Sequence, residues 1–274
     1  MAISKKMSER IAAGMKKMVP IVHQLSSRDV SEADTVALVK DMLCDVFGYD
    51  KYADVTGQYA IRGTFCDLAI ISADKKVLEL IEIKAIGITL NDRHVKQAVD
   101  YAANLGSEWV ILTNAQIWRL YRVIFSKPLD KQLVAEIDVT KCDANKEDDL
   151  DLLYLFTKEG FKRGAPSELH DKQEATSRFL LATVILNNKD VLRIVRRELR
   201  RVVDVSVSEE DIQKVIAQEV IKRDVLEGPQ AEEAAARVRK AQSRTLRQEP
   251  KPSVQNHSPV AGGPAPVGGA PLQA

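Results

Sequence analysis

Asp67, Glu82 and Lys84 are the combination of side chains in this sequence that is best suited to chemistry. If the two carboxylates lie opposite each other on paired strands, they repel and weaken the sheet. The same pair suits a divalent cation, because Mg²⁺ prefers hard oxygen ligands. A Glu-x-Lys triplet on one strand face is also common as a solvated ion pair, which contributes little to stability. The surroundings of these residues must therefore decide between a metal site and a solvated face.

The surrounding sequence predicts two strands joined by a tight turn. Residues 65–71 and 77–84 are rich in β-branched and aliphatic side chains, and Asp74 and Lys75 form a polar break between them. With the turn centred on that break, the strand pairing places the two acids directly opposite each other. Side chains alternate between faces with period two, so the lysine shares the face of the acids.

Burial favours the metal site. Residues 77–86 are mostly apolar, which is typical of a buried central strand rather than an edge strand. A buried carboxylate needs a cation, a proton or a specific hydrogen-bond network, because a desolvated charge is costly. A metal ion would satisfy both acids at once.

The composition indicates a folded protein of the cytoplasm. The chain has 274 residues, 45% of them hydrophobic, enough for one sizeable core with an appendage or for two modest domains. Its net charge of +1 gives no global argument for nucleic-acid binding, so any such attraction must be local. Cys44, Cys66 and Cys142 stand far apart, which is typical of reduced thiols and argues against a disulfide framework or a zinc site. The sequence shows neither a signal peptide nor an apolar run of ~18 residues, so no membrane partner is expected.

Further helices and strands are predicted around the hairpin. A helix over residues 8–24, interrupted late by Pro20, precedes a second helix that begins after Ser31 and ends at Gly48. The remaining elements are a strand over 55–61, a helix over 91–105, a strand over 109–113 and a final strand over 117–123. Because the helix at 91–105 crosses from one strand to the next, the predicted class is α/β, with a mixed central sheet flanked by helices.

The composition changes beyond residue 125 and predicts a helical C-terminal region. The expected helices cover residues 172–186, 189–203, 208–226 and 231–248. Residues 249–274 are rich in Pro, Gly and Ala, which is typical of a disordered tail. The sequence thus divides into a first domain (1–165), a helical region (166–248) and the tail.

The helix expected over residues 189–203 carries the strongest local basic feature. Beside its apolar stripe lie five arginines: Arg193, Arg196, Arg197, Arg200 and Arg201. They form either a solvated face paired with nearby acids or a face that binds phosphates, and the sequence leaves both interpretations open.

A known family matches this arrangement. The residues that carry the match are Glu32 at a helix start, Asp67 in FCDLAII, Glu82 and Lys84 in IEIK, and Gln97 and Tyr101 in KQAVDYA. Together they resemble the nuclease domain of type I restriction enzyme R subunits, in the PD-(D/E)XK nuclease superfamily, over roughly residues 30–125. Cys66 stands where the name-giving proline would be. No G-x-x-x-x-G-K-[ST] motif occurs, so the ATP-driven translocase of those subunits is not expected here.

The resemblance implies a restriction-endonuclease-like core and a role for each matched residue. Asp67 and Glu82 would ligate Mg²⁺, or Mn²⁺ in its place, together with the backbone carbonyl of Ile83. Lys84 would orient the attacking water or stabilise charge on the phosphate. Glu32 would support the site from its helix, although an acid in a first helical turn also simply complements the helix dipole.

Gln97 and Tyr101 are four residues apart and so share one helical face. The resemblance implies that they meet the scissile strand or brace the active-site strand. A plain packing contact between helix and sheet explains the pair equally well. His94, near the start of the same helix, is expected to be exposed or to cap the helix.

The leading hypothesis is a metal-dependent endonuclease that hydrolyses phosphodiester bonds, with DNA as the expected substrate. The resemblance suggests defence against foreign DNA, and a mobile-element or repair role fits the residues as well. In this hypothesis Gln97, Tyr101 and the arginines at 193, 196, 197 and 200 contact the nucleic acid. The alternative is a nucleic-acid-binding or scaffold subunit of such a complex that keeps the fold without turnover. A third hypothesis adds self-association, or a partner subunit, through residues 172–226.

Overall fold

The computed structural model describes residues 3–61 and 64–248, so the expected tail lies outside the described residues. The chain forms two compact units, Met1–Thr176 and Ser177–Ala274. Within the described residues, no helix combines the length and apolar character that a membrane span requires.

The first unit is built on a six-stranded mixed sheet, with the strands in sequential order from β1 to β6. The strands are β1 (Val55–Ile61), β2 (Thr64–Ile71), β3 (Val77–Ile83), β4 (Trp109–Thr113), β5 (Ile117–Ile124) and β6 (Asp130–Asp138). Only β3 and β4 are parallel among these neighbours, and helix α3 (Asp92–Leu105) makes the crossover between them. The predicted α/β class with a mixed sheet is therefore confirmed.

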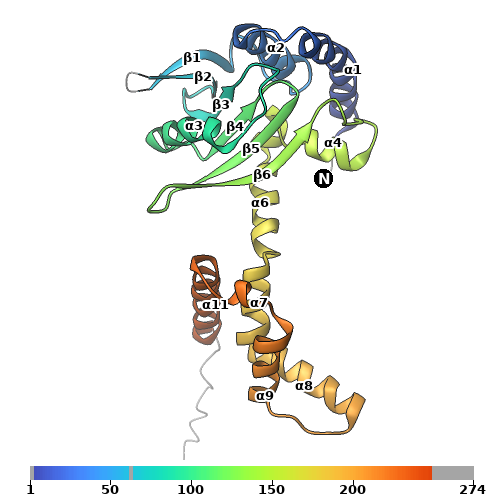
Figure 1. Ribbon diagram of the computed structural model, residues 1–274, viewed down its shortest axis with the longest axis vertical. Helices are drawn as coiled ribbons and strands as arrows, with labels where there is room; N and C mark the ends of the chain where they lie inside the picture. Colours follow the sequence, from blue (N-terminus) through green and yellow to red (C-terminus); the bar gives the residue numbers. More distant parts are fainter. Residues whose placement is uncertain (1–2, 62–63, 249–274) are drawn as a thin grey trace, which may run out of the picture. The chain divides into compact units, whose positions relative to one another are not determined.

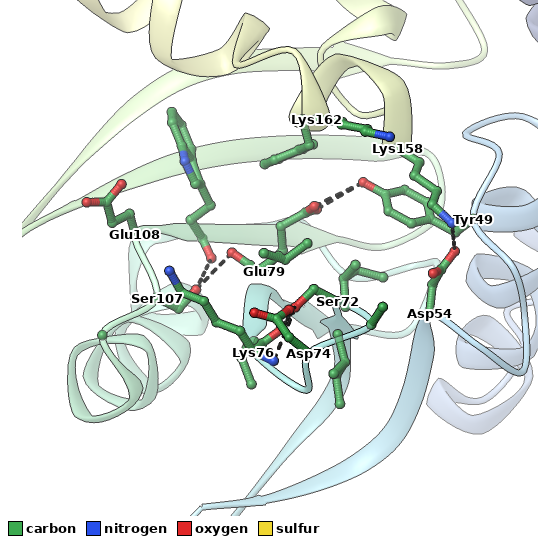
Figure 2. Close-up of a pocket in the computed structure, with 18 residues that line it drawn as sticks. Tyr49, Asp54, Ser72, Asp74, Lys76, Glu79, Ser107, Glu108, Lys158 and Lys162 are labelled. Atoms are coloured by element: carbon green, nitrogen blue, oxygen red, sulfur yellow. Dashed lines mark hydrogen bonds and ion pairs between the residues drawn. The ribbon is translucent and has the colours of Figure 1, made fainter.

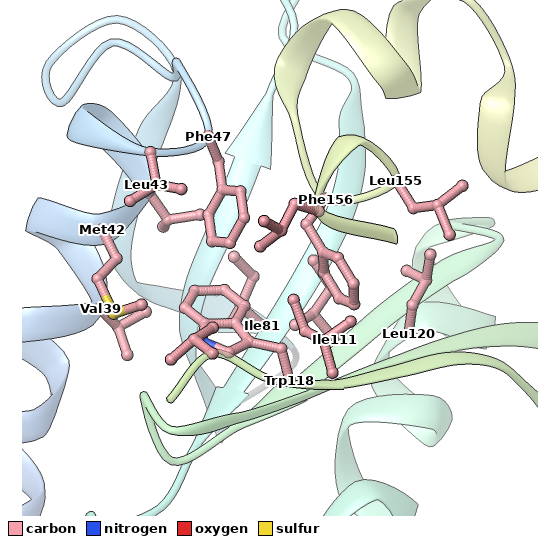
Figure 3. Packing of buried hydrophobic residues seen from close by; sticks show 14 of the residues in the cluster. Val39, Met42, Leu43, Phe47, Ile81, Ile111, Trp118, Leu120, Leu155 and Phe156 are labelled. Carbon is pink, nitrogen blue, oxygen red and sulfur yellow. The ribbon is translucent and has the colours of Figure 1, made fainter. Parts of the chain in front are cut away.

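Helices cover both faces of this sheet (Figure 1). On one face pack α1 (Lys5–Ser27), α2 (Glu32–Asp45), α4 (Glu147–Tyr154), α5 (Lys158–Lys162) and α6 (Ala165–Ala175). On the other face α3 packs against a second, smaller cluster. In the larger core, Phe47, Trp118 and Phe156, which come from distant parts of the chain, pack against one another (Figure 3). Phe47 meets Trp118 edge-on, with ring centroids 4.8 Å apart, and so joins the end of α2 to β5.

Strand β6 corrects the prediction that the strand over 117–123 is the last one. It pairs antiparallel with β5 along Ile117↔Asp138 to Ile124↔Asp130. The sequence signal is weak because β6 is an edge strand with charged side chains such as Lys131 and Glu136 among its apolar ones.

Two details of the helices in the first unit also differ from the prediction. Helix α1 continues through Pro20 without interruption, because apolar side chains on both sides of it, such as Met18 and Val22, are fully packed in the core. Helix α6 packs on β6, and Gln173 Nε2 donates to the carbonyl oxygen of Val134 at 2.9 Å. Residues 166–176 thus belong to the first compact unit.

The β2–β3 hairpin reaches the predicted register by an unexpected route. The pairs Leu68↔Ile81 and Ala69↔Leu80 are those that a turn centred on Asp74 and Lys75 predicts. The turn itself is closed by a different pair, which is offset by one residue from the predicted pairing. The backbone N–H of Ser72 donates to the carbonyl oxygen of Lys76 at 2.9 Å. A β-bulge next to Ile70 restores the register, so both irregularities cancel before the strands reach the acids.

The second unit is helical. It contains α7 (Arg178–Asn187), α8 (Lys189–Val203), α9 (Glu209–Val215), a short π-helix (Ile216–Val220), α10 (Arg223–Leu226) and α11 (Pro229–Gln248). The helix expected over 172–186 is wrong as one piece, because it breaks at Thr176, where Ser177 caps α7. The helix expected over 208–226 is likewise divided, whereas the boundaries of α8 are as predicted.

Candidate active site

Asp67, Glu82 and Lys84 lie at the end of the central hairpin that is nearest to the start of α2. The register of β2 and β3 ends at Leu68↔Ile81, and its next position outward brings Asp67 opposite Glu82. Leu80, two residues before Glu82, packs in the cluster beneath α3. The acids therefore belong to the face that α3 covers, as the period-two alternation requires.

Direct contacts join these side chains. Lys84 Nζ lies 2.7 Å from Glu82 Oε1 and 3.8 Å from Glu32 Oε2. Asp67 Oδ2 accepts a hydrogen bond from the backbone N–H of Ile83 at 2.7 Å. The Glu82 side chain is only 8% exposed, while that of Glu32 is 50% exposed. The structure thus brings together four of the predicted site residues, with Glu82 at the buried end and Glu32 at the solvent side.

Burial and neighbouring charge set the protonation of the site. Burial raises the pKa of Glu82 above its ordinary value, and the nearby carboxylate of Asp67 adds to the rise, although the Lys84 hydrogen bond opposes it. Burial acts to lower the pKa of Lys84, but the hydrogen bond and charge of Glu82 outweigh burial, so the net direction is upward. Lys84 is therefore a stable cation next to a carboxylate that is harder to ionise.

Cys66 plays no direct part in this chemistry. Its side chain is fully buried, and burial raises the pKa of the thiol to about 12. It therefore remains a neutral thiol and does not offer a thiolate ligand to a metal.

The donor set fits a magnesium ion held through few protein ligands. Among the described residues, no group of three or more His, Cys, Asp or Glu side chains is arranged to hold a metal. Mg²⁺ commonly takes only one or two carboxylates and keeps several waters. Asp67 and Glu82, with the carbonyl of Ile83, provide such a hard-oxygen set, in which the third acid, Glu32, contacts Lys84 instead.

A buried threonine fixes helix α2 to the segment that follows the active-site strand. Ser31 caps the helix and accepts from Asp34 N, which sets where Glu32 begins the first turn. Thr35 is fully buried, and its Oγ1 accepts from the backbone N–H of Ile86 at 3.1 Å. Sequence reasoning missed Thr35, whose only signal was a polar residue within the apolar stripe of α2.

A second set of contacts fixes the segment that follows Lys84. The backbone N–H of Lys84 donates to the carbonyl of Thr113 on β4 at 2.9 Å. Asn114 Nδ2 donates to the carbonyls of Ile86 and Ile88 at 3.3 and 3.0 Å. Asn114 is itself buried, and it holds this segment against β4.

Helix α3 contains the other predicted site pair. Gln97 Nε2 donates to the hydroxyl of Tyr101, whose ring is buried in the cluster between α3 and the sheet. The pair therefore forms a contact within one helical face, with Gln97 at the exposed side. His94 is part of a capping box, since its ring accepts from the N–H of Asn91, as one of its two predicted roles required.

The arginines of α8 lie in the second unit and form ion pairs with acids. Arg193 and Arg196 contact Glu209, and Arg197 and Arg201 contact Glu198. Within the described part of the chain, Arg200 has no such pair. The solvated, paired interpretation thus accounts for most of this surface.

Comparison with known proteins bears on the hairpin and α3. Residues 39–137 match the model of a family described as the type I restriction enzyme R protein N terminus. The resemblance to restriction R proteins is confirmed. The part that matches this R-protein N-terminal family begins inside α2 and ends in β6, so it includes the Asp67, Glu82 and Lys84 cluster. Glu32 precedes the matched segment.

No curated protein matches the chain. A solved structure titled "cryoEM structure DrdV-DNA complex" is similar at 15% sequence identity, with a TM-score of 0.37. That similarity covers 86% of this chain and 27% of the other, so this chain corresponds to about a quarter of that protein's length.

Proposed function

We propose that this protein is a metal-dependent nuclease that hydrolyses phosphodiester bonds in DNA. The observation that carries the proposal is the convergence of Asp67, Glu82 and Lys84 at one end of a buried central hairpin. The family match supports it, because the matched segment contains all three residues. A buried acid (Glu82) next to a half-buried one (Asp67) and a cation has no advantage for the sheet itself, and it is the arrangement that metal-assisted hydrolysis needs.

Each side chain has a distinct task in this proposal. The carboxylates of Asp67 and Glu82, with the Ile83 carbonyl, would hold Mg²⁺, and Mn²⁺ would substitute for it. When bound, the metal supplies an activated water and neutralises charge on the phosphate. Lys84 holds its ammonium 2.7 Å from Glu82, within reach of the same site, and so orients the nucleophile or stabilises the developing phosphate charge.

Glu32 and the α3 pair act at the margins of the site. Glu32 lies 3.8 Å from the Lys84 ammonium and keeps that side chain aimed at the acids. Gln97 is exposed on α3, the helix that covers the catalytic face, and we assign it and Tyr101 to contact with the nucleic acid backbone.

The direct test is cleavage of supercoiled plasmid DNA by the purified protein with Mg²⁺ or Mn²⁺. Wild type is expected to nick or cut, whereas Asp67→Ala, Glu82→Ala and Lys84→Ala suppress cleavage. Lys16→Ala and Asp171→Ala remove an exposed lysine on α1 and an exposed acid on α6, so they serve as matched controls and retain activity. Equal cutting by all five variants would remove the nuclease assignment.

A non-catalytic DNA-binding subunit is the second candidate, and Arg200 favours it because this side chain is left without an acidic partner in the described residues. Binding through Arg193, Arg196, Arg197 and Arg200 would weaken steeply with salt and persist in chelator. A gel-shift titration of an Arg196→Ala/Arg200→Ala variant over a range of salt concentrations separates this candidate from the first. Salt-sensitive binding without cleavage in any metal would favour the binding subunit.

The second unit also supports a proposal of self-association through residues 172–226. The predicted apolar stripe of α8 is buried only at Leu192, while Leu199 and Val202 on the same stripe are 38% and 80% exposed. Exposed apolar side chains gathered on one helix mark interaction surfaces. Light scattering on the full chain and on Val202→Asp tests this, since an equal mass for both, at the value of one chain, contradicts self-association.

A further inference from the structure

Gln58, on the edge strand β1, lies directly across from Asp67 on β2. The pair Gly57↔Leu68 precedes this position, and the one-to-one pairing of the two strands continues beyond it to the end of β1. No further strand covers the outer side of β1 in the described sheet, and the Gln58 side chain is exposed (Figure 1). The backbone of Gln58 therefore acts on Asp67 directly, through the strand pairing.

The backbone of Gln58 is left-handed, with φ at +48°, a region that is disfavoured for residues with a Cβ. Four other non-glycine residues of the described chain share a positive φ, and they lie in turns or at a helix end: Asp29, Lys75, Ala115 and Asp204. Among these residues, Gln58 alone lies within a strand. A bulge can hold a left-handed residue by adding one residue to a strand, but the pairing here keeps its one-to-one count. The strand pairing therefore does not relieve the strain.

The ribbon formed by β1 and β2 changes faces at this position. Leu68 packs in the larger core, on the α2 side of the sheet. Two residues before it, Cys66 packs in the cluster beneath α3, together with Tyr59 from the opposite strand. Side chains two residues apart share a face in a regular strand, so the ribbon must rotate between these positions. The left-handed conformation of Gln58 supplies that rotation, at the level of Asp67.

Asp67 also lies where the pairing of β2 with β3 ends, one residue before the last pair, Leu68↔Ile81. The backbone N–H of Lys84 points to β4, so that of Ile83 points to β2 and would otherwise continue the pairing with a backbone carbonyl. Instead it donates to Asp67 Oδ2 at 2.7 Å. The rotated ribbon thus leaves the Asp67 carboxylate, rather than the backbone of β2, facing the strand that carries Glu82.

The polar groups at the other end of the hairpin satisfy one another. A cavity beside the β2–β3 turn has Tyr49, Asp54, Glu79 and Lys158 among its lining residues (Figure 2). The Glu79 carboxyl lies 3.0 Å from the Tyr49 hydroxyl, and Lys158 is paired with Asp54. Gln58, by contrast, has no side-chain hydrogen bond to any described residue that could offset its backbone strain. Strain of this kind is typical of functional sites, where the surrounding structure maintains it.

We propose that Gln58 is a positioning residue of the nuclease site, whose left-handed backbone rotates the outer β1–β2 ribbon and so directs the Asp67 carboxylate toward the metal. The inference rests on the proposed nuclease function, in which Asp67 is a metal ligand. The role belongs to the backbone conformation at position 58 and not to the side-chain amide. A residue that favours an extended backbone therefore misdirects Asp67, whereas glycine preserves its direction.

The test is calorimetric Mg²⁺ titration of full-length variants at position 58. A branched Cβ strongly disfavours a positive φ, so Gln58→Val should lower the Mg²⁺ affinity about tenfold or more. Gln58→Gly adopts the same φ freely, and Gln58→Ala removes only the amide, so both should stay within about twofold of wild type. Thr56→Val is the matched control, because Thr56 is exposed on the same strand and paired regularly with Ala69.

A second measurement requires neither metal nor DNA. In a chelator, Gln58→Gly should raise the melting temperature, because loss of the Cβ relieves the left-handed strain. Thr56→Gly should lower it, because glycine weakens a regular strand. If Gln58→Val does not fold, Gln58→Thr, which is also β-branched, takes its place in the titration. Equal falls in melting temperature for Gln58→Gly and Thr56→Gly would contradict the strained backbone.

The outcomes separate this inference from the nuclease proposal. A purely structural role would leave the Mg²⁺ affinity unchanged in every variant that is folded at the temperature of titration. Equal affinity in wild type and Gln58→Val therefore overturns the positioning role and leaves the metal site intact. Equal losses in Gln58→Ala and Gln58→Val also overturn it, because they assign the role to the amide. Absence of Mg²⁺ binding by the wild type overturns both proposals.

Discussion

Glu79 and Glu82 are neighbouring acids of β3 that project from opposite faces of the sheet, and both are buried. Glu79 meets the neutral hydroxyl of Tyr49, and Glu82 meets the ammonium of Lys84. Burial raises the pKa of both carboxyls, but only Glu82 has a cation to offset it. One strand thus carries two acids with different tasks, set by what each one faces.

Stability should depend on pH through Glu79. Its pKa in the folded protein is about 8 against an ordinary value of 4.5, so the folded state binds the proton more tightly than the unfolded state. The free energy of unfolding therefore falls as pH rises between these two values, and it changes no further above about 8. Thermal melts of wild type and Glu79→Gln across this range should show a flatter profile for the variant. Parallel profiles would contradict the burial of an ionisable group at this position.

On acidification, metal binding should be lost at a higher pH than it would be if Glu82 were exposed. The raised pKa of Glu82 means that its carboxyl is protonated at a pH where an exposed glutamate is still ionised, and a protonated carboxyl is a poor ligand. Calorimetric Mg²⁺ titrations from about pH 8 to about pH 5 should show the affinity falling in step with proton release on binding. The variant Glu82→Ala should bind weakly at every pH. A Mg²⁺ affinity that stays constant across this pH range would count against Glu82 as a ligand.

Removal of the Lys84 ammonium should separate chemistry from metal binding. The variant Lys84→Met keeps a similar stem, and we expect single-turnover cleavage to slow by about 10²–10³-fold. Loss of the cation also makes Glu82 harder to ionise, so the comparison belongs at about pH 8, where Mg²⁺ affinity should change little. A variant that loses metal affinity and rate in equal proportion would make Lys84 a structural partner of Glu82 only.

Thr35 should matter to the site although it touches none of the reacting groups. In Thr35→Val the backbone N–H of Ile86 keeps its burial but loses its acceptor, which costs about 1–3 kcal/mol of stability. Because this bond ties α2 to the segment after Lys84, cleavage should also decline. Thr35→Ser keeps the acceptor and should restore most of the rate. Denaturant unfolding measures the first effect and plasmid cleavage the second.

Local patterns predicted most of the sheet and the candidate site. Alternation and turn residues placed the strand boundaries within one residue at β1, β2, β3, β4 and β5. The prediction that Asp67 and Glu82 share a face followed from the period of the strands alone. It holds although the turn was predicted incorrectly, because the bulge near Ile70 restores the register. Such cancellation cannot be foreseen, since it depends on hydrogen bonds of the turn rather than on the strand pattern.

Other features depended on tertiary contacts that a local pattern does not encode. The charged edge strand β6 forms because β5 offers it a partner, and α1 passes through Pro20 because the core fixes both of its ends. The buried roles of Thr35 and Asn114 depend on backbone groups about 50 and 30 residues away in the sequence. The cavity beside Glu79 likewise arises from four separate segments.

The bond from the backbone of Lys84 to Thr113 also restricts when the protein can act. A nascent chain that has left the ribosome only as far as α3 already carries both acids and the lysine, yet the strand that aligns them is still missing. For the nuclease function proposed above, hydrolytic competence would arrive only with the docking of β4, so a half-synthesised or proteolytically clipped fragment would be inactive.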